Sequence, residues 1–159
     1  MAQRDDRERD RLLTEGAETY RRYISAEVVH GYATASAIGI NATDFFCLNL
    51  VALAGSMSAG ELARRTGLTT GATTRLIDRL EDAGLVRRVR AADRRQVIVE
   101  LTGDRLPEID KAIEPARRRL LEVFQSFDAE QIRTIFTYFA TATTALVAAV
   151  EELTTRPDA

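Results

Sequence analysis

The chain has a single cysteine and a single histidine among its 159 residues. With Cys47 alone, no internal disulfide framework can form, which fits a reducing compartment. With His30 alone, zinc sites of the HExxH kind are excluded, and the sequence shows no nucleophile–base pair of a histidine-based triad. A glycine-rich phosphate loop is also absent. The composition therefore predicts no catalytic residues, no metal site and no cofactor, and an enzyme is the least favoured class of function.

The chain also lacks a hydrophobic run that would predict a membrane span. The charge-free stretch at residues 134–150 holds 17 residues, five of them threonines, whereas a span needs about 20 apolar residues. We expect a buried helix there. Residues 1–13 form a charged run without the apolar core of a secretory signal. We therefore expect a cytoplasmic protein with no membrane partner.

Neither sign of charge dominates, because 22 basic side chains face 24 acidic ones. One short stretch is nevertheless strongly basic: RRVRAADRR, residues 87–95, holds five arginines in nine positions. With 45% hydrophobic and 29% charged residues, the composition is typical of a globular protein. A chain of this length can bury its own core. The basic stretch therefore needs a local explanation.

A short helix is predicted ahead of this stretch. Ser58 and Glu61 form a capping box, in which the hydroxyl accepts a hydrogen bond from the backbone and the carboxylate reaches back to it. These two residues predict a helix over 59–65, with Leu62 and Ala63 on its buried side. Gly67 is suited to end it.

A second helix follows after a short turn. Thr69 is a suitable N-cap for a helix over 70–83, and Gly84 is suited to end it. Two short helices joined by a glycine-containing turn predict a helix-turn-helix. The apolar face of the second helix consists of Ala72, Thr73, Leu76, Ile77 and Leu80.

After Gly84 the hydrophobic period changes from 3.6 to 2. LVRRVR and QVIVELT carry β-branched residues at alternate positions, and AADR lies between them as a turn. This pattern predicts a β-hairpin that would form a wing beside the helix-turn-helix. The fold class is therefore mainly α with a small β-hairpin wing.

Helices are predicted on both sides of this region. They cover about the first 35 residues, residues 41–53 with Asn41 or Thr43 as N-cap, and a segment from Pro107 to about Phe127 that Pro115 would kink or shorten. Asp128 is a suitable N-cap for a last helix over 129–153. Its apolar positions, 132, 136, 139, 143, 146 and 150, are close to a heptad seam in which Thr143 is polar.

Positive charge is concentrated in the predicted helix-turn-helix and wing. Residues 64–95 carry nine arginines and four acidic residues, a net charge of +5, whereas the remaining residues have a net charge of −7. An isolated arginine cluster is more often a solvated loop than a binding site. At the tip of a hairpin that follows a helix-turn-helix, however, it favours binding to the DNA backbone.

Residues 56–102 resemble the winged helix-turn-helix of the MarR-type transcriptional regulators. The resemblance is most specific in GLTTGATTRLIDRLEDAGLVRR and in the DRR of the wing, followed by ELT. It departs from the family pattern in a shorter wing without proline, in Thr73 at an aliphatic core position, and in the early Gly103.

The resemblance implies a homodimer that binds an inverted-repeat operator in double-stranded DNA. It also implies repression that a small aromatic or phenolic effector, or oxidation, relieves. The implied organisation is an N-terminal dimerisation helix over 1–35, a winged helix-turn-helix over 36–102 and C-terminal dimerisation helices over 103–159.

Outward-facing residues of the second helix are the candidate base-reading positions. Arg75 can hold a guanine through two hydrogen bonds, and Thr70 and Thr74 can contact bases or phosphates. Arg79 is open to two interpretations, a phosphate contact or an ion pair with Asp78 or Asp82. The full set of candidate DNA-binding residues is Thr70, Gly71, Thr74, Arg75, Arg79, Arg94 and Arg95.

On the wing, Arg94 and Arg95 would reach the minor groove or its phosphates, and the resemblance favours Arg95 for the groove. Asp93 would orient an arginine. On the first helix, Arg64 and Arg65 would contact phosphates at most.

The resemblance also places an effector pocket near His30, and we take Tyr20, His30, Phe45 and Phe46 as its candidate residues. Cys47 has apolar neighbours and no nearby cation, so a buried structural thiol is favoured over a redox-sensing one. The alternatives to a ligand-responsive repressor are a regulator that senses oxidants through Cys47 and a winged-helix module that binds other proteins instead of DNA.

Overall fold

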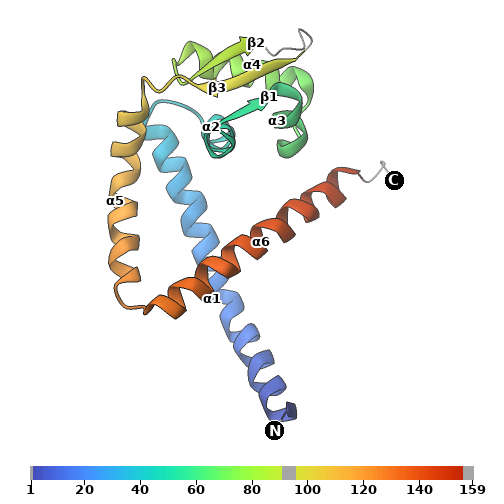
Figure 1. Cartoon of the computed structure of the whole chain (residues 1–159), viewed down its shortest axis with the longest axis vertical. Helices are drawn as coiled ribbons and strands as arrows, with labels where there is room; N and C mark the ends of the chain where they lie inside the picture. Colours follow the sequence, from blue (N-terminus) through green and yellow to red (C-terminus); the bar gives the residue numbers. More distant parts are fainter. Residues whose placement is uncertain (1, 91–95, 156–159) are drawn as a thin grey trace. The chain divides into compact units, whose positions relative to one another are not determined.

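The computed structural model describes the backbone of residues 2–90 and 96–155, and the side chains of 5–89 and 96–153 within it. It is mainly helical with a small sheet, as the sequence predicts (Figure 1). The chain divides into two compact units, residues 1–45 and 46–159. The elements, in order, are α1 (Ala2–Ala37), α2 (Ala42–Ala54), β1 (Ser56–Ser58), α3 (Ala59–Thr66), α4 (Thr70–Asp82), β2 (Val86–Arg90), β3 (Val97–Leu101), α5 (Leu106–Phe124) and α6 (Ala129–Thr155).

The first unit consists of α1 and the first turn of α2. A left-handed glycine, Gly39 with φ 76°, follows the end of α1. Of the two candidate caps for α2, the structure uses Asn41, whose side-chain oxygen accepts a hydrogen bond from the Asp44 backbone N–H at 2.9 Å. The Asn41 amide in turn donates to the Asp44 carboxylate at 2.7 Å, so α2 begins at a fixed residue.

In the second unit, α3 and α4 form the predicted helix-turn-helix. The Ser58 hydroxyl accepts the Glu61 N–H at 3.1 Å, and the Thr69 hydroxyl accepts the Ala72 N–H at 3.3 Å. Between the helices, Gly67 adopts φ 70°, which favours glycine. The second half of the predicted capping box is wrong. The Glu61 carboxylate binds Arg64 and Arg65 instead of reaching back to the cap.

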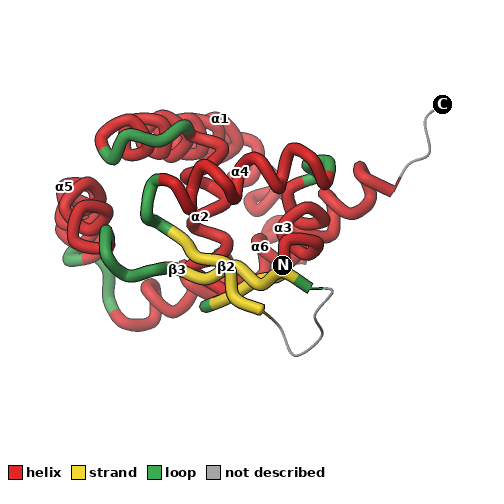
Figure 2. Tube along the Cα trace, turned by 90° about the horizontal axis from the view of Figure 1, so that it is seen from above, coloured by secondary structure: helices red, strands yellow, loops and turns green. Residues whose placement is uncertain are grey.

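The sheet has three strands, whereas the sequence predicts two. The order is β1-β3-β2, and all neighbours are antiparallel (Figure 2). The additional strand β1 pairs Met57 with Val99, and on the other side of β3 the same Val99 pairs with Arg88. A strand of three residues is too short to show a period of 2 in the sequence.

The core of this domain lies between the sheet and the two helices. The predicted inner face of α4 is buried except for Ala72, which is half-buried. Thr73 fits the core because its hydroxyl donates to the Thr69 carbonyl at 3.0 Å, which satisfies the polar group that burial would otherwise penalise. The other buried side chains of the domain include Met57, Leu62, Leu85, Val86 and Val99.

The last two helices are long and joined by a short connection. Pro115 lies inside α5, so this proline does not set a boundary, and the helix ends at Phe124 instead of near Phe127. Asp128 is the N-cap of α6, as predicted: its carboxylate accepts hydrogen bonds from the N–H groups of Glu130 and Gln131 at 2.9 and 2.8 Å. At the joint, Phe124 of α5 stacks on Phe136 of α6 with ring centroids 5.5 Å apart.

The expectation that residues 134–150 are buried is wrong for the single chain. Nearly every described side chain of α6 is exposed, and the apolar ones include Phe136, Leu146 and Val147, each more than half exposed. Over Ala129–Leu153 the helix is also long and apolar enough to cross a membrane by length and composition alone. Its amphipathic pattern, in which Thr134, Thr137 and Thr141 lie opposite the predicted seam, is typical of a helix with one covered face.

The N-cap of α3 provides a test of the helix-turn-helix geometry. Replacing Ser58 by Ala removes the acceptor for the Glu61 N–H and should lower the free energy of unfolding by about 1 kcal/mol. Ser58→Asp keeps an acceptor and should remain close to the parent. Chemical denaturation of the three proteins checks this, and equal stability of Ser58→Ala and the parent would contradict it.

Candidate nucleic-acid interface

The outer face of α4 carries the residues that the sequence predicts to meet DNA. Thr70, Gly71, Thr74, Arg75 and Arg79 are all exposed, while Leu76, Ile77 and Leu80 on the other side are at most 1% exposed. The helix is therefore rotated as predicted. That these residues contact DNA remains a prediction.

The N-terminal turns of α4 place polar groups close together. The Thr74 hydroxyl donates to the Thr70 carbonyl at 2.9 Å. The Arg75 guanidinium extends back toward the start of the helix, because its Nη1 lies 3.9 Å from where a Cβ on Gly71 would be. With the described residues Arg75 forms no ion pair.

The arginine-rich stretch is partly neutralised within the chain, because two of its arginines bind carboxylates. Arg87 on β2 binds Glu100 on β3 at 2.7 Å. Arg88, the next residue, binds Asp78 and Glu81 of α4. Asp78, one of the two candidate partners of Arg79, is bound by Arg88. Arg94 and Arg95, with Asp93, lie outside the described residues.

Of Arg87 and Arg88, Arg88 is the less exposed, with 30% of its side chain accessible. Burial by itself lowers the pKa of its guanidinium. The hydrogen bonds that the guanidinium donates to Asp78 and Glu81 outweigh this effect, so its pKa is raised above its ordinary value. Arg88 is therefore a permanent cation whose charge is compensated by two carboxylates.

The two arginines at the end of α3 are also paired. The Arg64 guanidinium binds Glu61 at 2.9 Å and Glu151 of α6 at 2.7 Å, and Arg65 binds Glu61 at 2.6 Å. Hydrogen bonds from Arg64 and then Arg65 lower the pKa of the Glu61 carboxyl to about 2. Both guanidinium groups thus bind carboxylates, and a contact of either arginine with a phosphate remains a prediction.

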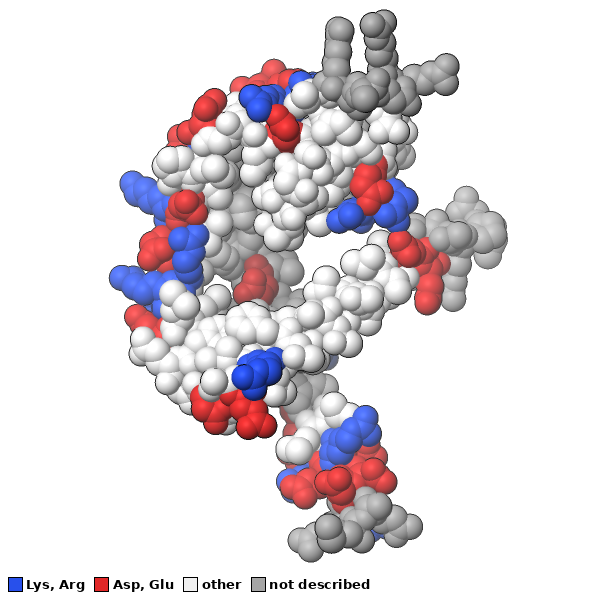
Figure 3. All heavy atoms as spheres, viewed as in Figure 1, with Lys and Arg blue, Asp and Glu red and all other residues white. Residues whose placement is uncertain are grey.

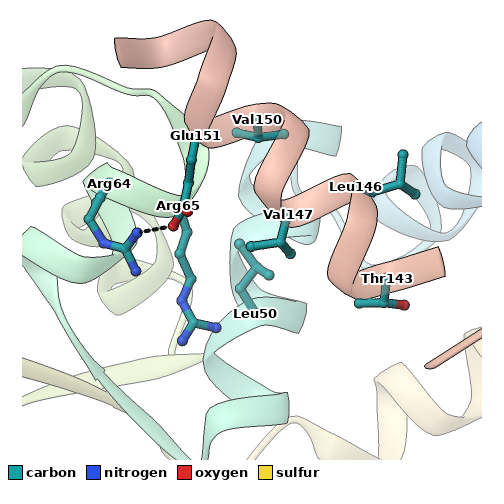
Figure 4. Close-up of a pocket in the computed structure, with 8 residues that line it drawn as sticks. All are labelled: Leu50, Arg64, Arg65, Thr143, Leu146, Val147, Val150 and Glu151. Atoms are coloured by element: carbon teal, nitrogen blue, oxygen red, sulfur yellow. Dashed lines mark hydrogen bonds and ion pairs between the residues drawn. The ribbon is translucent and has the colours of Figure 1, made fainter. Parts of the chain in front are cut away.

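Beside this cluster lies an apolar groove of about 390 Å³ (Figure 4). In the figure, Val147 of α6 points toward Leu50 of α2, and a dashed line joins Arg64 to Glu151. Thr143, Leu146 and Val150 belong to the predicted heptad seam, so the groove is part of the uncovered face of α6. Its lining residues are Leu50, Arg64, Arg65, Thr143, Leu146, Val147, Val150 and Glu151.

Charge is unevenly distributed over the surface. Figure 3 shows basic and acidic side chains interleaved along α5, whereas α6 presents a mostly uncharged surface between its two ends. On α5, for example, Arg117 binds Asp110 at 3.0 Å and Glu114 at 3.3 Å. The uncharged surface of α6 is therefore more suited to a protein partner than to a phosphate backbone.

None of the four candidate effector residues lines this groove. Tyr20 and Phe46 are exposed, and His30 and Phe45 are half-buried. The His30 Nε2 lies 3.5 Å from the Thr34 hydroxyl. Their role in binding an effector remains a prediction. Cys47 is buried, as predicted, and the described residues contain no cluster of three or more His, Cys, Asp or Glu that could hold a metal ion.

Comparisons with known proteins agree with this architecture. Residues 38–96 match the model of the MarR family. The uncharacterized HTH-type transcriptional regulator YcgE of Bacillus subtilis (strain 168) is 32% identical over 147 residues, which cover 91% of this chain and 95% of that protein. The chain belongs to the MarR family. Like its relatives, this MarR family member is therefore a transcriptional regulator.

Solved structures of the MarR family have the same fold. A MarR family protein from Bacillus stearothermophilus is 29% identical, with a TM-score of 0.65 over 86% of this chain and 96% of that one. A mutant MarR from E. coli, solved in complex with operator DNA, is 22% identical, with a TM-score of 0.50 over 82% of this chain and 97% of that one.

The sequence analysis missed the contact of Arg88 with α4. Alternation along β2 was the available signal, because it places Arg88 on the same face as Val86, the buried residue two positions earlier. The identity of the facing carboxylates depends on the packing of β2 against α4, which no sequence pattern specifies.

Proposed function

We propose that this MarR family member binds an inverted-repeat operator as a homodimer and represses transcription until a small aromatic effector releases it. The observation that carries DNA binding is the outer face of α4, where Thr70, Thr74 and Arg75 are exposed on a helix whose opposite face is buried. The operator complex of E. coli MarR, a protein of the same fold, supports the proposal.

In this proposal the N-terminal part of α4 enters the major groove. Arg75 donates two hydrogen bonds to a guanine, and the threonine methyl and hydroxyl groups contact a thymine methyl or a phosphate. Arg94 and Arg95 of the wing contact the flanking minor groove or its phosphates. A module that binds other proteins would not need an exposed arginine and exposed hydroxyl groups on this helix, so DNA is the favoured partner.

The proposed dimer is formed by the terminal segments, residues 1–35 and 103–159. Residues of α6 advance by 100° around the helix axis, so Phe136, Phe139, Leu146 and Val150 lie on one side and the threonines at 134, 137 and 141 on the other. All four apolar side chains are substantially exposed in the single chain. A second copy of the chain covers these side chains with the same stripe of its own α6. This arrangement gives the two-fold symmetry that an inverted repeat requires.

DNA binding is tested by replacing Arg75 with Ala. The loss of a two-bond base contact should weaken binding to the operator by about 1–3 kcal/mol and flatten the preference at one position of it. Arg95→Ala should instead weaken specific and non-specific DNA alike and lower the salt slope by about one unit. Selection from random duplexes, followed by titrations at several salt concentrations, measures both effects.

Arg118→Ala provides the control, since it removes one arginine from α5 and should leave the selected motif unchanged. A parent protein that selects no sequence and shows no salt-dependent binding to duplex DNA would contradict the proposed function.

Dimerisation is tested on α6. Leu146→Asp places a charge in the proposed seam and should weaken self-association at least about 100-fold, because each copy loses roughly 1.5–3 kcal/mol of apolar burial. Thr141→Asp places the same charge on the opposite side and should remain dimeric. Light scattering at several concentrations measures the mass, and an unchanged dimer in Leu146→Asp would show that the seam is elsewhere.

In this proposal the effector is a small aromatic molecule, and its candidate binding residues are Tyr20, His30, Phe45 and Phe46. A small aromatic acid such as benzoate should raise the melting temperature and weaken operator binding together, because both effects follow from one binding equilibrium. Thermal melts and operator titrations with and without benzoate test this. A ligand that changes neither quantity is not an effector. The burial of Cys47 favours a structural role for its thiol over oxidant sensing.

A further inference from the structure

Arg88 joins β2 of the wing to α4 through three hydrogen bonds. Its backbone N–H donates to Oε1 of Glu81 at 3.1 Å, its Nη1 binds Oε2 of the same carboxylate, and its Nη2 binds Oδ1 of Asp78. One residue of β2 therefore engages two carboxylates that lie three positions apart on α4. On the opposite side of the strand, Arg87 binds Glu100 of β3, within the sheet.

The position of Arg88 along β2 explains why such a contact matters. Val86, on the same face, is 1% exposed and packs in the core, whereas 30% of the Arg88 side chain is accessible. Apolar packing between the strand and α4 thus ends between these two residues. Beyond Val86, the bonds of Arg88 join β2 to the helix.

The contact with Arg88 also determines which other groups the Asp78 carboxylate can bind. Asp78 is exposed on α4, three positions after Arg75 and four after Thr74. Residues at these spacings are neighbours on a helix surface, so an unpaired carboxylate there would bind the Arg75 guanidinium or repel phosphates. In the structure Asp78 is bound by Arg88, and Arg75 has no ion pair with the described residues.

We propose that Arg88 is a positioning residue for operator recognition: by binding Glu81 and Asp78 it fixes β2 on α4 and keeps Arg75 available to read a base. The proposal rests on the proposed function, because it concerns how the same interface is held in shape. It assigns Arg88 no contact with DNA.

The first experiment compares Arg88→Ala with Arg87→Ala, which removes the same charge from the neighbouring residue of the strand. Arg88→Ala should bind the operator about tenfold more weakly, as expected from the loss of two partly exposed ion pairs, with a salt slope within about half a unit of the parent. Arg87→Ala should bind within about threefold of the parent. A salt slope lower by about one unit in Arg88→Ala would identify a phosphate contact and overturn the proposal.

The second experiment uses the sign of a charge effect. Glu81→Ala removes a negative charge and by electrostatics alone should strengthen DNA binding. If Glu81 acts through Arg88, the variant should bind more weakly instead. Affinity equal to or above that of the parent would contradict the proposal.

The third experiment concerns Asp78. In Arg88→Ala the selected motif should flatten at the same position as in Arg75→Ala, because the released Asp78 captures Arg75. Adding Asp78→Ala to Arg88→Ala should restore the preference at that position. If the double variant does not restore this preference, the proposed capture of Arg75 by Asp78 is contradicted.

A measurement without DNA separates this proposal from the proposed function. Hydrogen exchange of the free protein should become at least about fivefold faster for the backbone amides of residues 86–90 in Arg88→Ala and in Glu81→Ala, but not in Arg87→Ala. Unchanged exchange in the first two variants would overturn the proposal even if the parent binds an operator. Faster exchange with a parent that binds no DNA would contradict only the proposed function.

Discussion

The rotation of α4 about its own axis is the constraint on which the rest of the interface depends. Leu76, Ile77 and Leu80 are almost completely buried between α3 and the sheet, and each contributes roughly 1.5–3 kcal/mol relative to an exposed position. Partly exposed ion pairs contribute about 0–1 kcal/mol each. The apolar face therefore fixes the helix, and Thr70, Thr74 and Arg75 face outward as a geometric consequence.

Arginine has two different roles in the basic segment. Arg64, Arg65, Arg87 and Arg88 all bind carboxylates of the chain, which connects α3 to α6, β2 to β3 and β2 to α4. In contrast, Arg75 forms no ion pair with the described residues. A guanidinium is suited to both roles, because it is always charged and presents several donors in one plane. Net charge along the sequence cannot distinguish them, since it counts a paired and an available arginine equally.

The terminal helices present the opposite situation, in which the single chain leaves apolar surface without a partner. In the domain formed by α3, α4 and the sheet, the described side chains leave no buried polar atom without a hydrogen-bond partner, and apolar side chains form a core. In contrast, Phe136, Leu146 and Val147 of α6 are more than half exposed. The hydrophobic effect makes an exposed apolar stripe of this kind unfavourable in water, so this face of α6 is suited to association.

The sequence by itself determined the helix-turn-helix, because its signals are local. Ser58, Gly67 and Thr69 act on backbone groups within four residues of themselves, and the period of 3.6 along α4 records which side faces the core. The same locality identified Asp128 as the cap of α6. Tertiary structure decided the rest. The strand β1 exists because Met57 finds Val99, 42 positions later. Arg88 binds Asp78 and Glu81 because packing places β2 against α4. Ion pairs between different elements follow from proximity in space, which a linear pattern of charges does not encode.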